Sequence, residues 1–162
     1  MPNLSFVAVS FAIHVALALW IGGTVFLGVL AAPIIFREAP SRTFAGALTG
    51  AMVEGFAWIK LGAMSVLAAG AWVRYGRWEV WNGWIGARFA LIASACSLEL
   101  VATFLVGPRI LATRAAMKEA GLDFDRDVDH PLRKKFRRLH GAAMGLQLLA
   151  ALAAAGALFT FF

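Results

Sequence analysis

Six ionisable side chains lie inside long apolar stretches of this 162-residue sequence: His14, Glu54, Lys60, Arg88, Glu99 and His140. An ionisable group among apolar residues is costly to desolvate, so it is usually paired with another group or used in function. Carboxylate, amine and imidazole groups can exchange protons, and imidazole also binds transition metals. The positions of these groups relative to one another therefore decide which chemistry is available.

Helical rise places the ionisable groups in two layers. At about 1.5 Å per residue, His14, Lys60 and Arg88 fall roughly 15 to 20 Å from one end of their apolar stretches. Glu54 and Glu99 fall nearer the other end, about two helical turns away. We therefore expect no carboxylate at the depth of Lys60 and Arg88, and we expect any salt bridge to join different helices.

Several of these residues share helix faces with further metal-binding side chains. Cys96 and Glu99 lie on one face of their helix, and His140 and Met144 lie on one face of another. If the faces met, the mixed donors would suit copper, zinc or iron better than magnesium or calcium. Cys96 and Met144 are also common packing residues, and the whole set could instead be a hydrogen-bond network between helices. The candidate metal ligands are His14, His140, Glu54, Glu99, Met144 and Cys96.

The elements that position these residues are four long apolar segments. Hydrophobic residues make up 61% of the chain and charged residues only 15%, which is unusual for a soluble domain. A bilayer core of about 30 Å is crossed by roughly 20 apolar helical residues, and four stretches are long enough. The sequence predicts an all-α integral membrane four-helix bundle, a single domain over 1–162, with helices at about 4–36, 44–73, 80–110 and 134–162.

Basic residues gather at one end of the predicted bundle. Nine of the Lys and Arg residues lie between residues 109 and 138, whereas the connection at the opposite end carries only Arg74 and Arg77. By the positive-inside rule, a cytoplasmic loop with an amphipathic segment at about 111–133 contacts anionic lipids, and both termini lie on the non-cytoplasmic side. We expect a multi-pass protein of the inner (cytoplasmic) membrane, with no nucleic-acid partner.

Four aspartates at alternate positions, Asp123, Asp125, Asp127 and Asp129, resemble the start of a calcium-binding loop. The sixth position of such a loop is normally Gly and the twelfth Glu, but this chain has Val128 and Lys134 there. A solvated acidic segment that balances the following basic run is the favoured interpretation, with a weak divalent-cation site as the alternative.

Two pairs of glycines have the spacing that lets membrane helices approach closely. They are Gly46 with Gly50, and Gly141 with Gly145. Small residues four apart are typical of helix–helix contacts in lipid. We expect these pairs to pack helices within the chain or to form a homodimer or a larger membrane complex.

Four short motifs carry a family resemblance: HVALALWIGG at 14–23, AAPIIF at 31–36, VGPRILATR at 106–114 and FRRLHG at 136–141. Together they resemble the membrane family of unknown function that includes the eukaryotic cisplatin-resistance transmembrane protein. More distantly, the chain is similar to the CopD copper-resistance proteins and the HemJ-type protoporphyrinogen oxidases. The HemJ resemblance implies a haem-associated role for His14 and, through it, for Lys60.

Three functions remain open from the sequence. In the first, an intramembrane pocket binds haem b or a transition metal such as copper or iron, with His14 as a ligand and Lys60 and Arg88 on the haem propionates. In the second, Glu54 and Glu99 form part of a proton-coupled metal exporter. In the third, the protein is an accessory or assembly subunit without chemistry. An enzyme is the least supported class, because the sequence has no GxSxG, HExxH, P-loop or dinucleotide fingerprint.

Overall fold

The computed structural model describes residues 3–122, 127 and 129–162, and the regular elements within them are helical. The elements follow one another as α1 (Leu4–Val25), a π-helical turn (Phe26–Ala31), α2 (Ala32–Glu38), α3 (Arg42–Trp78), α4 (Gly83–Leu100), a second π-helical turn (Val101–Val106), α5 (Gly107–Glu119) and α6 (Pro131–Phe159). The aspartate-rich segment of the sequence falls largely on residues 123–126 and 128, which lie outside the described residues.

Both π-helical turns come directly before a proline. Pro33 is near the start of α2, and Pro108 is near the start of α5. Proline has no N–H to donate and its ring clashes with the carbonyl four residues earlier. The helix widens by a residue around that gap, but it does not break, so α1 and α2 form one span and α4 and α5 form another.

Four helical spans are long and apolar enough to cross a membrane: Leu4–Glu38, Arg42–Trp78, Gly83–Glu119 and Pro131–Phe159. No more than 28% of the most apolar window of any span is buried, so large side chains such as Phe11, Trp58 and Leu152 point outward. Such an apolar outer surface suits lipid rather than water. The prediction of a multi-pass, all-helical membrane protein is confirmed.

The helix ends are fixed by local capping interactions. The Ser41 side chain accepts a hydrogen bond from the Phe44 amide at the start of α3, and the Asn82 side chain caps the start of α4. After α5, Gly121 takes a positive φ of 64° and its amide bonds back to Lys118, a conformation that glycine adopts without strain. The second span therefore exceeds its predicted bounds at both ends, whereas the third begins three residues later than predicted and continues beyond residue 110 to Glu119.

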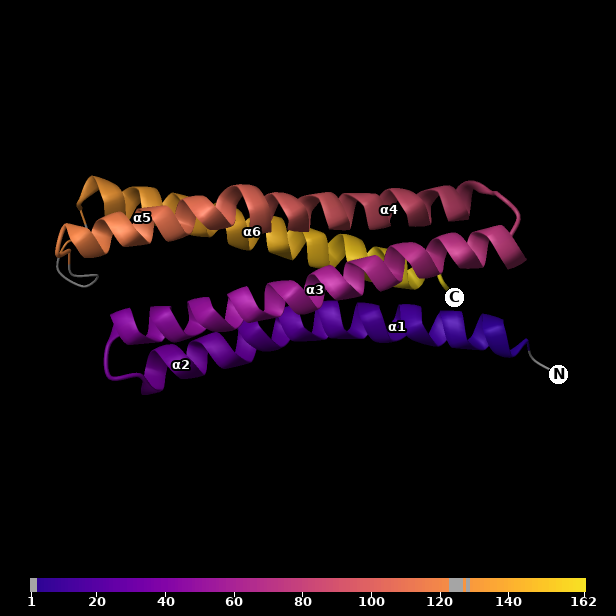
Figure 1. The fold of residues 1–162 in the computed structure, drawn as a ribbon, viewed down its shortest axis with the longest axis horizontal. Helices are drawn as coiled ribbons and strands as arrows, with labels where there is room; N and C mark the ends of the chain where they lie inside the picture. The colour runs from indigo at the N-terminus through magenta and orange to yellow at the C-terminus, as the bar shows by residue number, and fades with distance from the viewer. Residues whose placement is uncertain (1–2, 123–126, 128) are drawn as a thin grey trace.

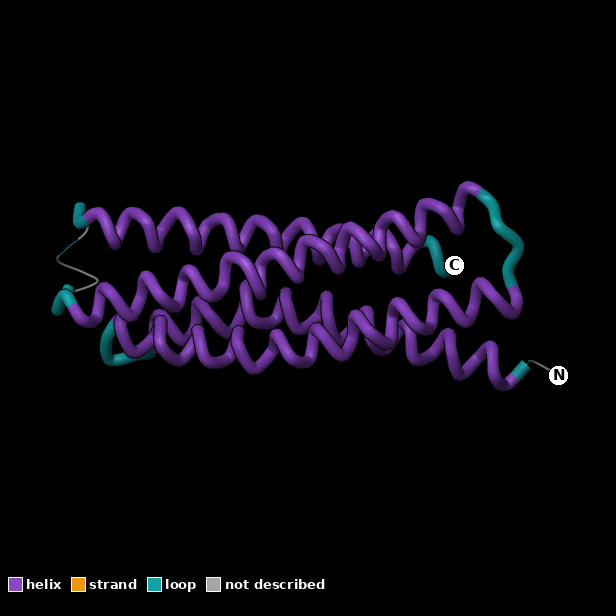
Figure 2. Tube along the Cα trace, turned by 45° about the horizontal axis from the view of Figure 1, so that its top comes forward, coloured by secondary structure: helices purple, strands orange, loops and turns teal. Residues whose placement is uncertain are grey.

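The spans pair into two helical hairpins. α1 packs chiefly against α3, and α4 packs chiefly against α6. Figure 1 shows α1, α2 and α3 in one part of the bundle and α4, α5 and α6 in the other. Lesser contacts of α1 with α6 and of α3 with α4 join the hairpins. Both termini lie at the same end, as Figure 2 also shows.

Glycines allow close contact between helices, but they are not the two predicted pairs with GxxxG spacing. A Cβ on Gly70 would stand 2.6 Å from Ile13, and Gly23 and Gly156 similarly face side chains of a neighbouring helix. Nothing lies within 4 Å of such an atom on Gly141 or Gly145. The expectation that this latter pair packs helices within one chain is therefore wrong, because their face of α6 points away from the other helices.

Replacing Gly70 by Leu is expected to destabilise the protein by about 1–3 kcal/mol, because the core around the fully buried Ile13 has no room for the added side chain. Gly62→Leu is the matched control on the same helix, since its position is open. Thermal unfolding in detergent measures both variants. Equal stability of the two would contradict this packing.

Candidate functional site

A buried ion pair joins the two hairpins. Lys60 Nζ of α3 donates to Glu99 Oε1 of α4 at 2.5 Å, and the two residues are only 2% and 1% exposed. The Thr103 hydroxyl donates to the same carboxylate oxygen at 3.3 Å. The second oxygen, Glu99 Oε2, is buried and has no hydrogen-bond partner among the described residues. The pair therefore holds opposite charges together while leaving one acceptor open.

The lengths of α3 and α4 explain why these residues meet. Lys60 lies about 18 residues before the end of α3, and Glu99 lies about 16 residues after the start of α4. Because the two helices are antiparallel neighbours across a short connection, these distances correspond to one depth, about 25 Å from that end. The prediction that Lys60 and Glu99 lie in separate layers is wrong, since it started from helix ends that were placed too early.

Trp20 of α1 lies level with this ion pair. Ile13 packs against Gly70 and Gly23 packs against Phe56, so the antiparallel register places Trp20 opposite Lys60. Trp20 is fully buried, and its indole Nε1 has no hydrogen-bond partner among the described residues. A free donor and a free acceptor thus lie at the same depth as the ion pair, where polar groups are normally satisfied.

A second charged cluster closes the bundle at the end that carries the termini. Arg88 donates to Glu79 Oε2 at 2.5 Å and to the Thr160 carbonyl at 2.6 Å. Arg74 donates to the other oxygen of Glu79 at 2.6 Å. Both guanidinium groups also lie over the Phe161 ring. The expectation that Lys60 and Arg88 lack a carboxylate at their depth is therefore wrong, because Glu99 and Glu79 pair with them.

His14 lies beside this cluster and is only partly buried. Its ring faces Phe161 and Phe162, at centroid distances of 6.3 and 5.6 Å. Its Nδ1 is 2.6 Å from the carbonyl oxygen of Ser10. Since a carbonyl only accepts hydrogen bonds, Nδ1 carries a proton, and in the neutral ring the lone pair is then on Nε2. The neutral ring of His14 is thus held in the tautomer that can bind a metal through Nε2.

The other predicted ligands do not gather at one place. Glu54, His140 and Met144 lie on exposed faces, and Cys96 is partly buried near Glu99. Within residues 3–122, 127 and 129–162, no group of three or more His, Cys, Asp and Glu side chains is close enough to hold a metal ion. A metal site that includes these residues stays a prediction.

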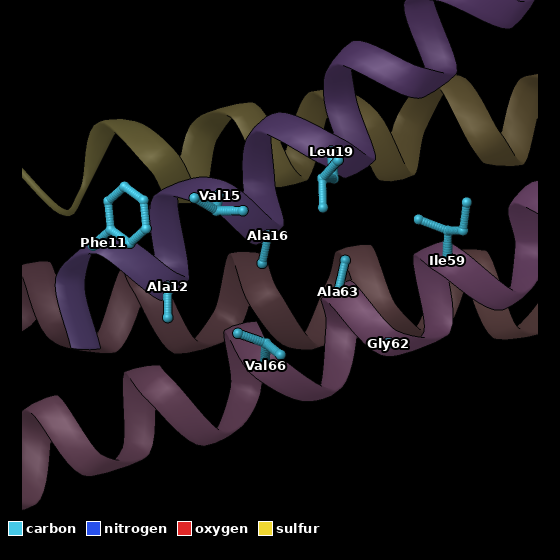
Figure 3. A pocket seen from close by; sticks show the side chains of 9 residues that line it. All are labelled: Phe11, Ala12, Val15, Ala16, Leu19, Ile59, Gly62, Ala63 and Val66. Carbon is cyan, nitrogen blue, oxygen red and sulfur yellow. The ribbon is translucent and has the colours of Figure 1, made fainter. Parts of the chain in front are cut away.

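A shallow groove of about 380 Å³ lies between α1 and α3 on the outer surface. Its lining is apolar, and Figure 3 shows Phe11, Val15 and Leu19 of α1 facing Ile59 and Val66 of α3. No ionisable residue lines it, and it reaches neither His14 nor Lys60. The groove suits a lipid chain and offers nothing for catalysis or for binding a charged cofactor.

Comparison with known families places the chain in one of them. The model described as "Domain of unknown function (DUF4149)" matches residues 15–119, which is more than half of the chain. The chain belongs to this family. The matched region contains Lys60 and Glu99 and begins one residue after His14. Searches of curated proteins and of solved structures found no match.

Sequence reasoning missed two residues of these clusters, Glu79 and Trp20. Glu79 lies in the connection between two helices, where charged residues are common and do not indicate a site. The available signal is that it is the only acidic residue between Arg74 and Arg88. Thr103 is different, because the sequence pattern already places it on the same helix face as Cys96 and Glu99, and the structure adds its hydrogen bond to the Glu99 carboxylate. Trp20 is of a residue type that commonly anchors helices at the membrane surface. Only its burial shows that its indole N–H faces the interior.

Removing either partner of the ion pair is expected to destabilise the protein by about 3–5 kcal/mol, because a single charge is left in the apolar interior. Lys60→Met and Glu99→Leu should each have this effect. The double variant Lys60→Met/Glu99→Leu should recover most of the loss, since both charges are gone. Unfolding in mixed micelles measures the cycle, and strictly additive losses would show that the two side chains do not interact.

Proposed function

We propose that this protein is a small proton-coupled transporter in which the Lys60–Glu99 pair is the proton-binding centre. The observation that carries the proposal is the bond between Lys60 and Glu99 across the two hairpins, with Glu99 Oε2 buried and unpartnered. Buried ionisable residues in membrane helices commonly mark proton or ion pathways. A charge pair used only for packing would not need an open carboxylate oxygen.

The arrangement of the two hairpins supports a transporter. Each hairpin consists of a span with a π-helical turn before a proline, followed by a straight span. Many transporters are built from two similar halves that rock against each other, with the coupling site at the interface between the halves. Lys60 and Glu99 occupy that interface, because α3 belongs to one hairpin and α4 to the other.

Protonation of Glu99 would change the force between the hairpins. A proton added to Oε2 converts the carboxylate to a neutral acid and removes the charge attraction for the Lys60 ammonium. The site then has one excess positive charge in an apolar setting, which favours movement of the hairpins or entry of a counter-charge. Loss of the proton restores the pair. The substrate class we favour is a metal cation exchanged for protons.

Glu54 contributes less to this proposal than the sequence indicated. It lies on an exposed face of α3, whereas Glu99 faces the interior. The two carboxylates therefore do not share a site in one chain. A role for Glu54 fits the alternative of an accessory subunit, in which its exposed face and that of Gly141 and Gly145 contact a second copy or a larger complex.

The membrane and orientation also belong to the proposal. One end of the bundle holds both the α2–α3 and the α5–α6 connections, and most of the basic residues lie at or near this end. We place this end in the cytoplasm and both termini on the opposite side of the inner membrane.

Haem or transition-metal binding at His14 is the second candidate, because the Ser10 bond leaves Nε2 available. The resemblance to the CopD and HemJ-type proteins reaches this histidine. The residues fit a single ligand to iron or copper. They do not fit the expected propionate contacts, since Lys60 and Arg88 are already paired with carboxylates.

The transporter proposal predicts that Glu99→Gln abolishes proton movement. Purified protein is placed in vesicles loaded with a pH-sensitive dye, and zinc, copper(I) or iron(II) is added outside. The wild type should change the internal pH, and Glu99→Gln should be at least about tenfold slower because Gln cannot take up the proton. The change keeps the size of the side chain, so that insertion is preserved.

Glu54→Gln is the matched control, since it removes an exposed carboxylate from the neighbouring helix. It should leave the proton flux unchanged. If none of the metals drives a flux, infrared titration of the wild type in lipid gives a second measurement, in which the protonated-carboxyl band should vanish in Glu99→Gln alone. Absence of that difference as well would rule out Glu99 as the proton-binding group.

The second candidate predicts a haem or metal that is lost on replacing His14. Wild-type protein purified in detergent should then show a Soret band or stoichiometric copper or iron, and His14→Ala should lose it while remaining inserted. His140→Ala, at the other end of the bundle, is the control. A wild-type spectrum of tryptophan alone, with no bound metal, would remove this candidate.

A further inference from the structure

An arginine without a partner lies at the basic end of the bundle. Arg114 of α5 reaches across to α3, where its guanidinium lies against Gly46 and Gly50. A Cβ at either glycine would stand 2.9 Å from a guanidinium nitrogen, closer than real contacts allow. The two glycines therefore form a cradle for the guanidinium, which would have to shift if either glycine carried a side chain. The neighbour of both glycines is thus the side chain of an arginine, and not the backbone of another helix.

The charge of Arg114 is not balanced by the protein. Among the described residues, Arg114 makes no hydrogen bond or ion pair, although it is partly buried. The three other arginine and lysine residues deep in the bundle, Lys60, Arg74 and Arg88, each bond to a carboxylate. The five N–H donors of this partly buried guanidinium are therefore open to an acceptor from outside the chain, and an anion would also balance the charge.

Other groups around the cradle favour an anion. Thr49 lies on the same face of α3 as the two glycines, and its Oγ1 is buried without a hydrogen-bond partner in the described part of the chain. α5 also packs against α6, so three helices lie around this end of the bundle. Thr49 can donate its hydroxyl proton to an anion, and basic pockets between helices are typical places for lipid phosphates.

The depth of the cradle matches a lipid headgroup. Gly46 and Gly50 lie about 30 residues from the opposite end of α3, which corresponds to about 45 Å of helix. A bilayer with its headgroup layers is about 40–45 Å thick. With the far end of α3 at one surface, Arg114 lies in the headgroup layer of the opposite leaflet, and the hydrocarbon core ends before it.

We propose that Arg114, Gly46, Gly50 and Thr49 form a binding site for the phosphate group of an anionic phospholipid. The guanidinium donates two parallel hydrogen bonds to the phosphate oxygens, and Thr49 donates a third. The lipid chains extend from this level along the apolar outer surface of the bundle. The lipid is a structural ligand that ties α3 to α5 and α6 and does not depend on the transporter proposal.

The test compares lipid retention by full-length protein in nanodiscs of phosphatidylcholine with a minor share of phosphatidylglycerol. Native mass spectrometry after release counts bound lipids of each kind. The wild type should keep phosphatidylglycerol, and Arg114→Ala should bind it about five- to tenfold more weakly. Gly50→Leu should have a similar effect by filling the cradle while the Arg114 charge remains.

Lys118→Ala is the matched control, because it removes an exposed cation from the same helix. An equal loss in this variant would overturn the site in favour of diffuse attraction to the basic surface. Retention of phosphatidylglycerol by Arg114→Ala would also overturn it. Added inorganic phosphate distinguishes a free anion from a lipid: if millimolar phosphate displaces the lipid from the wild type, the site is specific for phosphate alone and the lipid proposal fails. An unchanged far-ultraviolet circular dichroism spectrum of each variant confirms that it is folded.

Discussion

The need to neutralise charge in an apolar medium governs the organisation of this protein. Lys60 and Glu99 come from different hairpins, and each makes the burial of the other tolerable. Since neither charge can be left alone in lipid, the pair fixes the register of α3 against α4. The direct packing of α3 on α4 is slight compared with the packing inside each hairpin. The ion pair therefore adds a link between halves that otherwise meet through α1 with α6 and through the Glu79 cluster.

The same requirement operates at the end that carries the termini. Glu79 accepts from Arg74 and Arg88, and Arg88 also bonds to the last turn of α6 at Thr160. Three helices are thereby joined around one carboxylate, and both guanidinium groups lie over the Phe161 ring. The bundle is thus held by a polar clasp at one end and by an ion pair further in. Tryptophan and alanine packing fills the space between them.

Two prolines shape the opposite half of the molecule in parallel ways. Pro33 and Pro108 each follow a π-helical turn, and each span continues past its proline to a basic end. The turns leave backbone groups less tightly bonded than in an α-helix, which makes these levels the natural places for bending. Glu99 lies two residues before the second turn, and Thr103 of that turn bonds to it, so a change in the charge of Glu99 acts next to a part of the span that can bend.

The sequence by itself determined the four apolar spans, their helical state and the set of ionisable residues within them, because lipid admits few other structures for such a composition. It could not determine which charges meet. Helix ends were set by Ser41, Asn82 and the Trp78 region, and moving an end by five residues shifts depth by about 7 Å, enough to separate or join Lys60 and Glu99. The rotation of each helix likewise decided that Glu54 and Met144 face outward while Trp20 and Glu99 face inward. The ends and the rotations of the helices follow from how whole helices pack against one another. The residue pattern along a single helix carries no information about that packing.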